Sequence, residues 1–284
     1  ALDLVDKGTV ITTLDGKAVS GISVYSYTSL DKAPKELQDK LARANISPKG
    51  AFQVFEPDNH QAFYDTYVKT GQSLALLTKM KVKDSLYGQT VRYKNKAYQV
   101  DFGNGYETKE VVNTVVHPEP KKQNLNKDKV DINGKAMLVG SQNFYTLSWD
   151  LDQYRGLQAD KSQIAQGFYF VDDYPEDVLL PDTKAIQIMT KDGKAVKGME
   201  IKTYHQLSDA PKELQAALAK RNITPKGAFQ VFMPKDPQAF YKAYVTTGQN
   251  LTIVNPMTVR EAVYNSGKSY DNVAYQVDFG QAYE

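Results

Sequence analysis

Two pairs of aspartates are the residues of this sequence best suited to acid–base or metal chemistry. Asp150 and Asp152 follow one aromatic run, and Asp172 and Asp173 end another. Residues two apart on a strand share a face, so Asp150 and Asp152 could hold a cation such as Ca²⁺ through carboxylate oxygens. Adjacent strand residues face opposite ways, so Asp172 and Asp173 cannot flank one glycosidic bond as acid and base. We expect that the protein is not an enzyme and that it holds no cofactor other than such a cation. The alternative hypothesis is a β-sandwich domain that binds carbohydrate or cleaves glycosides.

Composition and charge argue against several other functional classes. The chain has 35 Lys+Arg against 33 Asp+Glu, so it lacks the basic excess that is typical of nucleic-acid binding. Its three histidines, His60, His117 and His205, show no metal or triad spacing. The longest apolar runs are a few residues, as at 74–77, which argues against membrane insertion. The absence of cysteine does not decide the redox compartment.

The strongest sign of organisation is an internal repeat. The four residues from Gly16 to Val19 recur from Gly193 to Val196, an offset of 177 positions. Two longer blocks recur at the same offset, 48–55 as 225–232 and 97–103 as 274–280. A period of this length corresponds to a whole domain rather than to a solenoid repeat. We therefore expect two related domains in tandem.

The phase of the repeat predicts the domain boundaries. Segment 117–122 is rich in proline and charge, as interdomain linkers are. We predict domains at 1–118 and 119–284. A unit that begins near Lys121 should end roughly a dozen residues beyond Glu284. We accordingly expect the C-terminal part of one module, followed by a second module that lacks its last strand.

Most of each repeat is predicted to be β-strand. Aromatic and β-branched runs at 144–149 and 167–171, and alternating residues at 185–189 and 274–279, are typical of strands. Two helices interrupt them. One begins at Pro211, with Leu214 and Leu218 on one face, and the other begins at Asp236-Pro237 and stops before Gly248. The pattern predicts a mainly β fold, a β-sandwich with short crossover helices.

A family resemblance, which covers essentially the whole chain, is carried by five long motifs: 145–154, 167–176, 210–215, 225–232 and 274–280. They resemble the C-terminal modules of the streptococcal antigen I/II adhesins. The resemblance implies tandem immunoglobulin-like sandwiches of the DE-variant type in an extracellular, cell-wall-anchored surface protein. It also implies an adhesive role toward host surface or salivary glycoproteins, or toward fimbriae of other microbes. A passive spacer is a further hypothesis.

The resemblance further implies a spontaneous Lys–Asn isopeptide bond, which would rationalise a chain without cysteine. Burial disfavours charge, so a buried lysine loses its proton and a buried aspartate keeps one. The neutral amine can then attack the carboxamide of the asparagine. The bond forms once per molecule and is therefore maturation rather than turnover.

By analogy with the family, the lysine lies on the first strand and the asparagine on the last. Lys122 is the preferred lysine of the second module, and Asn113 fits the last strand of the first. The rival lysines are Lys127 and Lys129, and the candidate acids are Asp172 and Asp173, with Asp150 weaker. The partner of Asn113 would precede Ala1, and the asparagine matching it in the second module would follow Glu284. We thus expect neither bond to form within its own module.

In oral members of the family, a helix and the Asn-Ile-Thr-Val-Lys-like stretch after it bind fimbriae of another bacterium. The corresponding residues here are Leu214, Leu218, Asn222, Ile223, Thr224, Pro225 and Lys226, and in the first repeat Asn45, Ile46, Ser47, Pro48 and Lys49. Proline replaces the valine and lacks a backbone donor, which weakens a strand-pairing contact. The alternative is a helix that packs its leucines on the sheet, followed by a turn.

Overall fold

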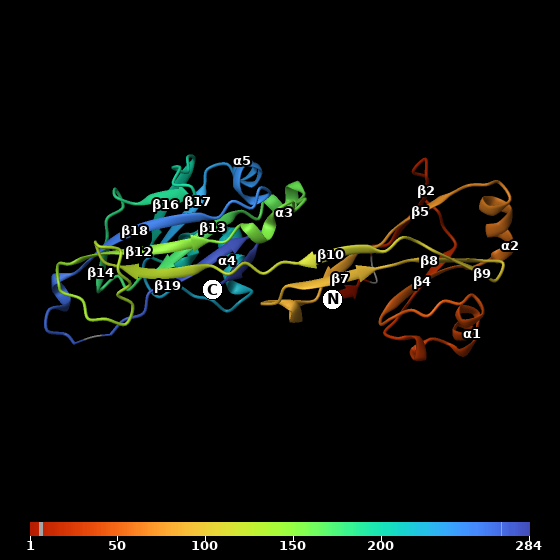
Figure 1. Cartoon of the computed structure of the whole chain (residues 1–284). Coiled ribbons are helices and arrows are strands. Elements are labelled where there is room, and N and C mark those ends of the chain that lie inside the picture. Colours follow the sequence, from red (N-terminus) through yellow and green to blue (C-terminus); the bar gives the residue numbers. More distant parts are fainter. Residues whose placement is uncertain (6–7, 268) are drawn as a thin grey trace. The chain divides into compact units, whose positions relative to one another are not determined.

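The computed structural model describes residues 1–5, 8–267 and 269–284. The chain divides into two compact units, Ala1–His117 (unit one) and Pro118–Glu284 (unit two), whose strands and helices are labelled in Figure 1. The boundary predicted after residue 118 lies one position from this division. Within the described ranges, no helix is long and apolar enough to cross a membrane.

Unit one consists of antiparallel strand pairs. The pairs are β1 (Leu2–Leu4) with β6 (Met80–Val82), β2 (Val10–Thr13) with β5 (Leu74–Leu77), β3 (Ile22–Tyr27) with β4 (Phe52–Pro57), β7 (Val91–Asn95) with β10 (Val111–Val115), and β8 (Tyr98–Asp101) with β9 (Asn104–Glu107). Its helical segments are η1 (Leu30–Lys32), α1 (Lys35–Arg43), α2 (His60–Phe63), η2 (Tyr64–Val68) and η3 (Asp84–Leu86). Val100 is 42% exposed in unit one, whereas its repeat counterpart Val277 is fully buried in unit two. This difference follows from strand pairing, because β8 pairs only with β9 among the described strands.

The described residues of unit two form two antiparallel sheets of five strands. The first has the order β11 (Lys121–Leu125), β12 (Gln142–Trp149), β18 (Leu251–Val259) and β14 (Leu179–Pro181), with β15 (Gln187–Thr190) also on β18. The second has the order β16 (Met199–Tyr204), β17 (Phe229–Pro234), β13 (Phe168–Asp173), β19 (Val273–Asp278) and β20 (Gln281–Tyr283). The predicted mainly β fold with short helices is confirmed.

An aromatic core joins the two sheets of unit two. Trp149 on β12 is fully buried, and its ring centroid lies 5.7 Å from that of Phe170 on β13 and 5.2 Å from that of Phe240. Phe168 packs edge-on against Phe279 at 4.9 Å. Aromatic pairs in these arrangements add to the free energy gained by burying their area. The sheets are therefore held face to face as a sandwich.

Strand β13 is buried on both of its faces. Its even-numbered residues Phe168, Phe170 and Asp172 face the first sheet, and Tyr169 and Val171 belong to a cluster on the opposite face, as the period of two in a strand requires. Helix α4 (Lys212–Ala219) covers that opposite face with Leu214, Ala217 and Leu218. Asp172 is consequently inside the sandwich, which strand alternation alone did not decide.

Helices α4 and α5 (Pro237–Phe240) begin close to the positions that Pro211 and Asp236 predict. Pro211 is the N-terminal cap of α4, one residue before its first turn. Asp236 caps α5 by accepting hydrogen bonds from the backbone N–H groups of Gln238 and Ala239. A π-helical turn, η6 (Tyr241–Val245), continues α5. The remaining helical segments are η4 (Asp152–Tyr154), α3 (Lys161–Ile164), η5 (Leu207–Asp209) and η7 (Glu261–Val263).

Candidate functional site

Lys122 is carried by the edge strand of the first sheet. It is the second residue of β11 and pairs with Leu147 on β12. Alternation along β11 leaves Lys121 exposed and turns Lys122 inward, so that its side chain is only 16% exposed. A long lysine stem can lie along apolar surface, but here the amine is enclosed as well.

The Lys122 amine meets a buried carboxyl group. Asp172, near the end of β13, is fully buried, and its Oδ1 lies 2.5 Å from Lys122 Nζ. The other carboxyl oxygen, Oδ2, accepts a hydrogen bond of 2.9 Å from Asn255 Nδ2 on β18. Residues 50 positions apart in the sequence, on different sheets, therefore form one tightly packed pair.

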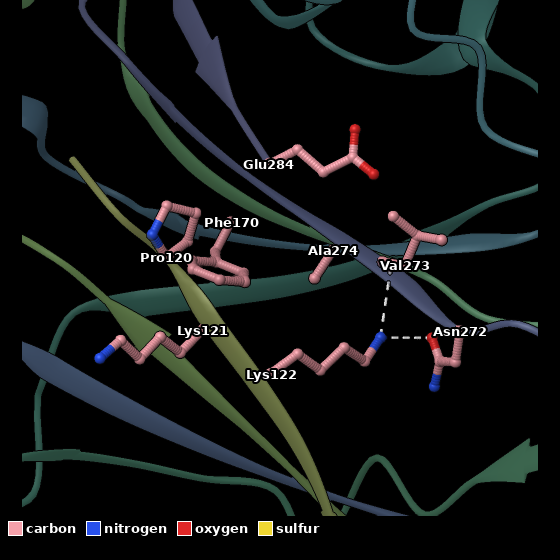
Figure 2. A pocket seen from close by; sticks show the side chains of 8 residues that line it. All are labelled: Pro120, Lys121, Lys122, Phe170, Asn272, Val273, Ala274 and Glu284. Carbon is pink, nitrogen blue, oxygen red and sulfur yellow. Dashed lines mark hydrogen bonds between the residues drawn. The ribbon is translucent and has the colours of Figure 1, made fainter. Parts of the chain in front are cut away.

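Asn272 completes a group of three side chains. It directly precedes β19, and its Oδ1 accepts a hydrogen bond from Lys122 Nζ. The backbone carbonyl oxygen of Val273 accepts another at 3.3 Å. Figure 2 shows the Lys122 side chain pointing at both acceptors beside a pocket of about 210 Å³. The Asn272 Nδ2 atom, which would be the leaving nitrogen of such a carboxamide, is buried from solvent as well.

Burial determines the electrostatics of this site. Removal from water lowers the pKa of the Lys122 amine, because the charged form loses its hydration, while the nearby Asp172 carboxylate opposes the shift. A lower pKa makes the neutral amine, which is the nucleophilic form, easier to reach. An amine that contacts both a carboxyl and a carboxamide has the groups required to exchange one amide for another.

The other predicted members of the site lie elsewhere. Lys127 and Lys129 are exposed in the turn after β11. Asp173 faces the other side of β13, where both of its carboxyl oxygens accept the backbone N–H of Lys226 at 3.0 Å. Burial raises the pKa of Asp173, and the Lys226 N–H opposes that shift. Asn113 lies on β10 of unit one, opposite Tyr93 of β7.

The prediction that Asp150 and Asp152 share one face of a strand is wrong. Strand β12 ends at Trp149, and Asp152 begins the short helix η4, so the two residues do not share a strand face. Asp150 Oδ2 accepts the backbone N–H of Glu119 at 3.0 Å, and Asp152 Oδ1 pairs with Arg155 at 2.7 Å. The part of the chain described by the structure has no group of three or more His, Cys, Asp or Glu side chains that could hold a metal.

The predicted partner-binding segment is divided between core and surface. Leu214 and Leu218 are fully buried in the cluster beneath α4, so the prediction that they contact a partner is wrong for the folded unit. Asn222 adopts a left-handed conformation with φ of 56°, as asparagine often does where a helix stops. Thr224 and Lys226 are exposed, whereas Ile223 is half-buried and Pro225 is buried.

The matching segment of unit one has the same form. Asn45, two positions after the last residue of α1, has φ of 58°, and Ile46 is 6% exposed. Ser47 and Lys49 are exposed and Pro48 is half-buried. In both units, the asparagine and the isoleucine thus have structural roles, in stopping a helix and in packing.

Replacing Leu218 by Ala should lower the free energy of unfolding of unit two by about 3 kcal/mol, because a buried leucine leaves a cavity. Urea unfolding followed by the fluorescence of Trp149, the sole tryptophan, measures this loss. Leu138, which is 80% exposed, is the matched control, and Leu138→Ala should change little. Unaltered stability in Leu218→Ala would contradict a core role.

Asn272, Asn255 and Gln230 are functional candidates that the sequence did not reveal. For Asn272 a signal existed: the residue repeats at offset 177, as Asn95 and Asn272. It lies two positions before the repeated block 274–280 and so outside the alternating pattern that predicts the strand. Asn255 carries no such signal, since its counterpart in the first repeat is Thr78.

Comparison with known proteins identifies the family. The profile of the cell surface antigen I/II C2 terminal domain matches residues 1–115 and 120–284. An aggregation substance of Enterococcus faecalis is 33% identical over 172 residues, which are 60% of this chain and 11% of that protein.

Two solved structures have a similar fold. The C-terminal domain of the Streptococcus pyogenes antigen I/II-family protein AspA is 30% identical, with a TM-score of 0.52 over 58% of this chain and 50% of that chain. The structure named BspA_C_mut is 30% identical, with a TM-score of 0.50 over 58% of this chain and 48% of that one. The chain spans about half of these solved relatives. By its profile match in both units, the chain belongs to the cell surface antigen I/II C2 terminal domain family.

Proposed function

We propose that this chain is a pair of stalk modules from a cell-wall-anchored adhesin, and that unit two is locked by an isopeptide bond between Lys122 and Asn272. The observation that carries the proposal is the contact of Lys122 Nζ with both the Asp172 carboxyl and the Asn272 carboxamide, inside a sandwich that has no cysteine. Family membership supports the surface location. The chain is the structural and adhesive part of such a protein, with no turnover.

The reaction needs no component from outside. Lys122 Nζ passes a proton to Asp172 Oδ1, and the neutral amine then attacks Cγ of Asn272. The protonated Asp172 donates to Asn272 Oδ1 as the charge of the tetrahedral intermediate develops there. The Nζ–Cγ bond forms and the Cγ–Nδ2 bond breaks. Lys122 Nζ loses two protons: one passes to Nδ2, so that ammonia leaves, and the one that Asp172 took up then passes to this ammonia, which departs as ammonium. Asp172 ends with the protonation state it had at the start.

The choice of Asn272 replaces the expectation that the asparagine of unit two lies beyond Glu284. Asn272 directly precedes the first residue of β19, and its carboxamide already accepts a hydrogen bond from Lys122. Reacting atoms held in contact avoid most of the entropy cost of bringing them together. A bond to Asn272 therefore forms within unit two itself.

The bond suits a stalk under mechanical load. It joins β11 of the first sheet to the residue that precedes β19 of the second, 150 positions along the chain. Pulling on unit two then loads a covalent bond instead of the hydrogen bonds between strands alone. Host glycoproteins or fimbriae of other microbes are the proposed partners, with exposed Thr224 and Lys226 among the available contact residues.

The denatured intact mass of the full chain tests the bond. We expect a mass about 17 Da below the sequence mass, one ammonia per amide formed. Lys122→Ala and Asn272→Ala should each restore the full mass. Lys129→Ala and Asn95→Ala are matched controls, because one is a rival lysine and the other is the repeat counterpart of Asn272; both should keep the deficit. A wild-type chain of full mass would refute the bond.

A further inference from the structure

A second pair of buried amides lies behind Asp172. Asn255 on β18 and Gln230 on β17 are both fully buried between the sheets. Asn255 Nδ2 donates to Asp172 Oδ2 at 2.9 Å and to Gln230 Oε1 at 2.6 Å. Polar side chains are costly to bury unless they are hydrogen-bonded, so this pair calls for an explanation.

The pair is not optimised for stability. Within the described part of the chain, the buried Asn255 Oδ1 and Gln230 Nε2 have no hydrogen-bond partner. Each unsatisfied group carries a desolvation cost that an apolar residue of similar size would avoid. Of the two hydrogen bonds that Asn255 donates, the one to Asp172 involves the carboxyl group that takes part in the proposed reaction.

This contact determines which carboxyl oxygen can carry a proton. A carboxamide nitrogen has two hydrogens, and both are used, one on Asp172 Oδ2 and one on Gln230 Oε1. Because Oδ2 already accepts a hydrogen, a proton taken from Lys122 goes to Oδ1. Oδ1 is the oxygen that lies 2.5 Å from Lys122 Nζ, on the side where Nζ meets Asn272.

We infer that Asn255 is a positioning residue for isopeptide formation: it fixes the Asp172 carboxyl so that Oδ1 takes the proton and delivers it toward Asn272. The inference rests on the proposed Lys122–Asn272 bond. Gln230 Oε1 accepts the second hydrogen of Asn255, and Gln230 makes no hydrogen bond to Asp172 among the described residues. Asn255 itself touches neither Lys122 nor Asn272 in any hydrogen bond of the described residues, and acts through Asp172.

The test is the rate of ammonia loss in the full chain. Wild type and three variants are made by cell-free synthesis, and the denatured mass is recorded at timed intervals, with Trp149 fluorescence as the check of folding. Asn255→Leu removes the donor at similar volume. Asn255→Thr keeps a donor and copies Thr78, the residue at the matching position of unit one. Gln230→Leu breaks the same buried network without touching Asp172.

We expect Asn255→Leu to form the bond about tenfold more slowly or worse, since a misdirected general acid costs at least this much. Asn255→Thr should recover part of the rate, and Gln230→Leu should stay closer to wild type. A merely structural role would slow Asn255→Leu and Gln230→Leu alike, because both break a buried hydrogen bond. Equal slowing, or a wild-type rate in Asn255→Leu, overturns the inference.

Three further outcomes are decisive. If Asn255→Leu does not fold, Asn255→Thr takes its place and should react more slowly than Gln230→Leu; an equal or faster rate overturns the inference. If the wild type shows no mass loss, the bond and the positioning role fall together. If the wild type loses about 17 Da while every Asn255 variant reacts at the same rate, the proposed function stands and only the positioning role is refuted.

Discussion

Asn272→Ala is expected to lower the free energy of unfolding of unit two by about 5 kcal/mol. The cross-link would connect residues 150 positions apart. By the loop-closure relation used for disulfides, closing a loop of that length removes enough entropy from the unfolded chain to account for this amount. Asn272→Ala is more informative than a change of Lys122, because it leaves the Lys122–Asp172 pair intact.

The measurement is urea unfolding followed by Trp149, which lies in the core of unit two and is the sole tryptophan of the chain. The transition of Asn272→Ala should move to lower urea, and Asn95→Ala should unfold as the wild type does. A reducing agent should change neither transition, because the chain contains no cysteine. Coincident transitions for Asn272→Ala and wild type would contradict a stabilising cross-link.

The architecture could be predicted because it depends on patterns that repeat. Strands at 144–149 and 167–171 appear as β12 and β13, and Asp236 with Pro237 begins a helix as expected. The π-helical turns η2 and η6 were not predicted, because apolar spacing at Phe240 and Tyr244 suits a continuing α-helix equally well. The sequence did not decide whether Leu214 and Leu218 pack in the core or contact a partner, because periodicity alone does not say what lies opposite a helix.

The site could be predicted only in part, for a physical reason. Lys122 and Asp172 could be predicted as candidates, because the sequence shows that Lys122 follows a linker and that Asp172 lies in an alternating strand. The two side chains are in contact. Asn272 was missed because its role depends on how the second sheet stacks on the first. Asn255 belongs to a third strand, β18, and only the packed sandwich brings it to Asp172. Contacts between sheets leave no local pattern.

The buried carboxyl of Asp278 should make unit two less stable at neutral pH than at mildly acid pH. Asp278 is fully buried; its Oδ1 accepts from Trp149 Nε1 at 3.1 Å and its Oδ2 from Gln276 Nε2 at 2.5 Å. Burial raises its pKa from the ordinary 3.8 to about 7. Between these two values the folded chain keeps a proton that the unfolded chain releases. Stability from this group is therefore complete below pH about 4 and is lost as pH rises to about 7.

The shift corresponds to up to about 4 kcal/mol across that window. Urea unfolding at a series of pH values, followed by Trp149, measures the slope, and Asp278→Asn should flatten it because an amide does not titrate there. Comparing the two proteins cancels the groups they share, including Asp173, whose pKa burial also raises. Asp101→Asn, the repeat counterpart in unit one, should keep the wild-type slope. An unchanged slope in Asp278→Asn would mean that Asp278 is already ionised at pH about 4 inside the folded sandwich, held as a carboxylate by the Trp149 and Gln276 donors.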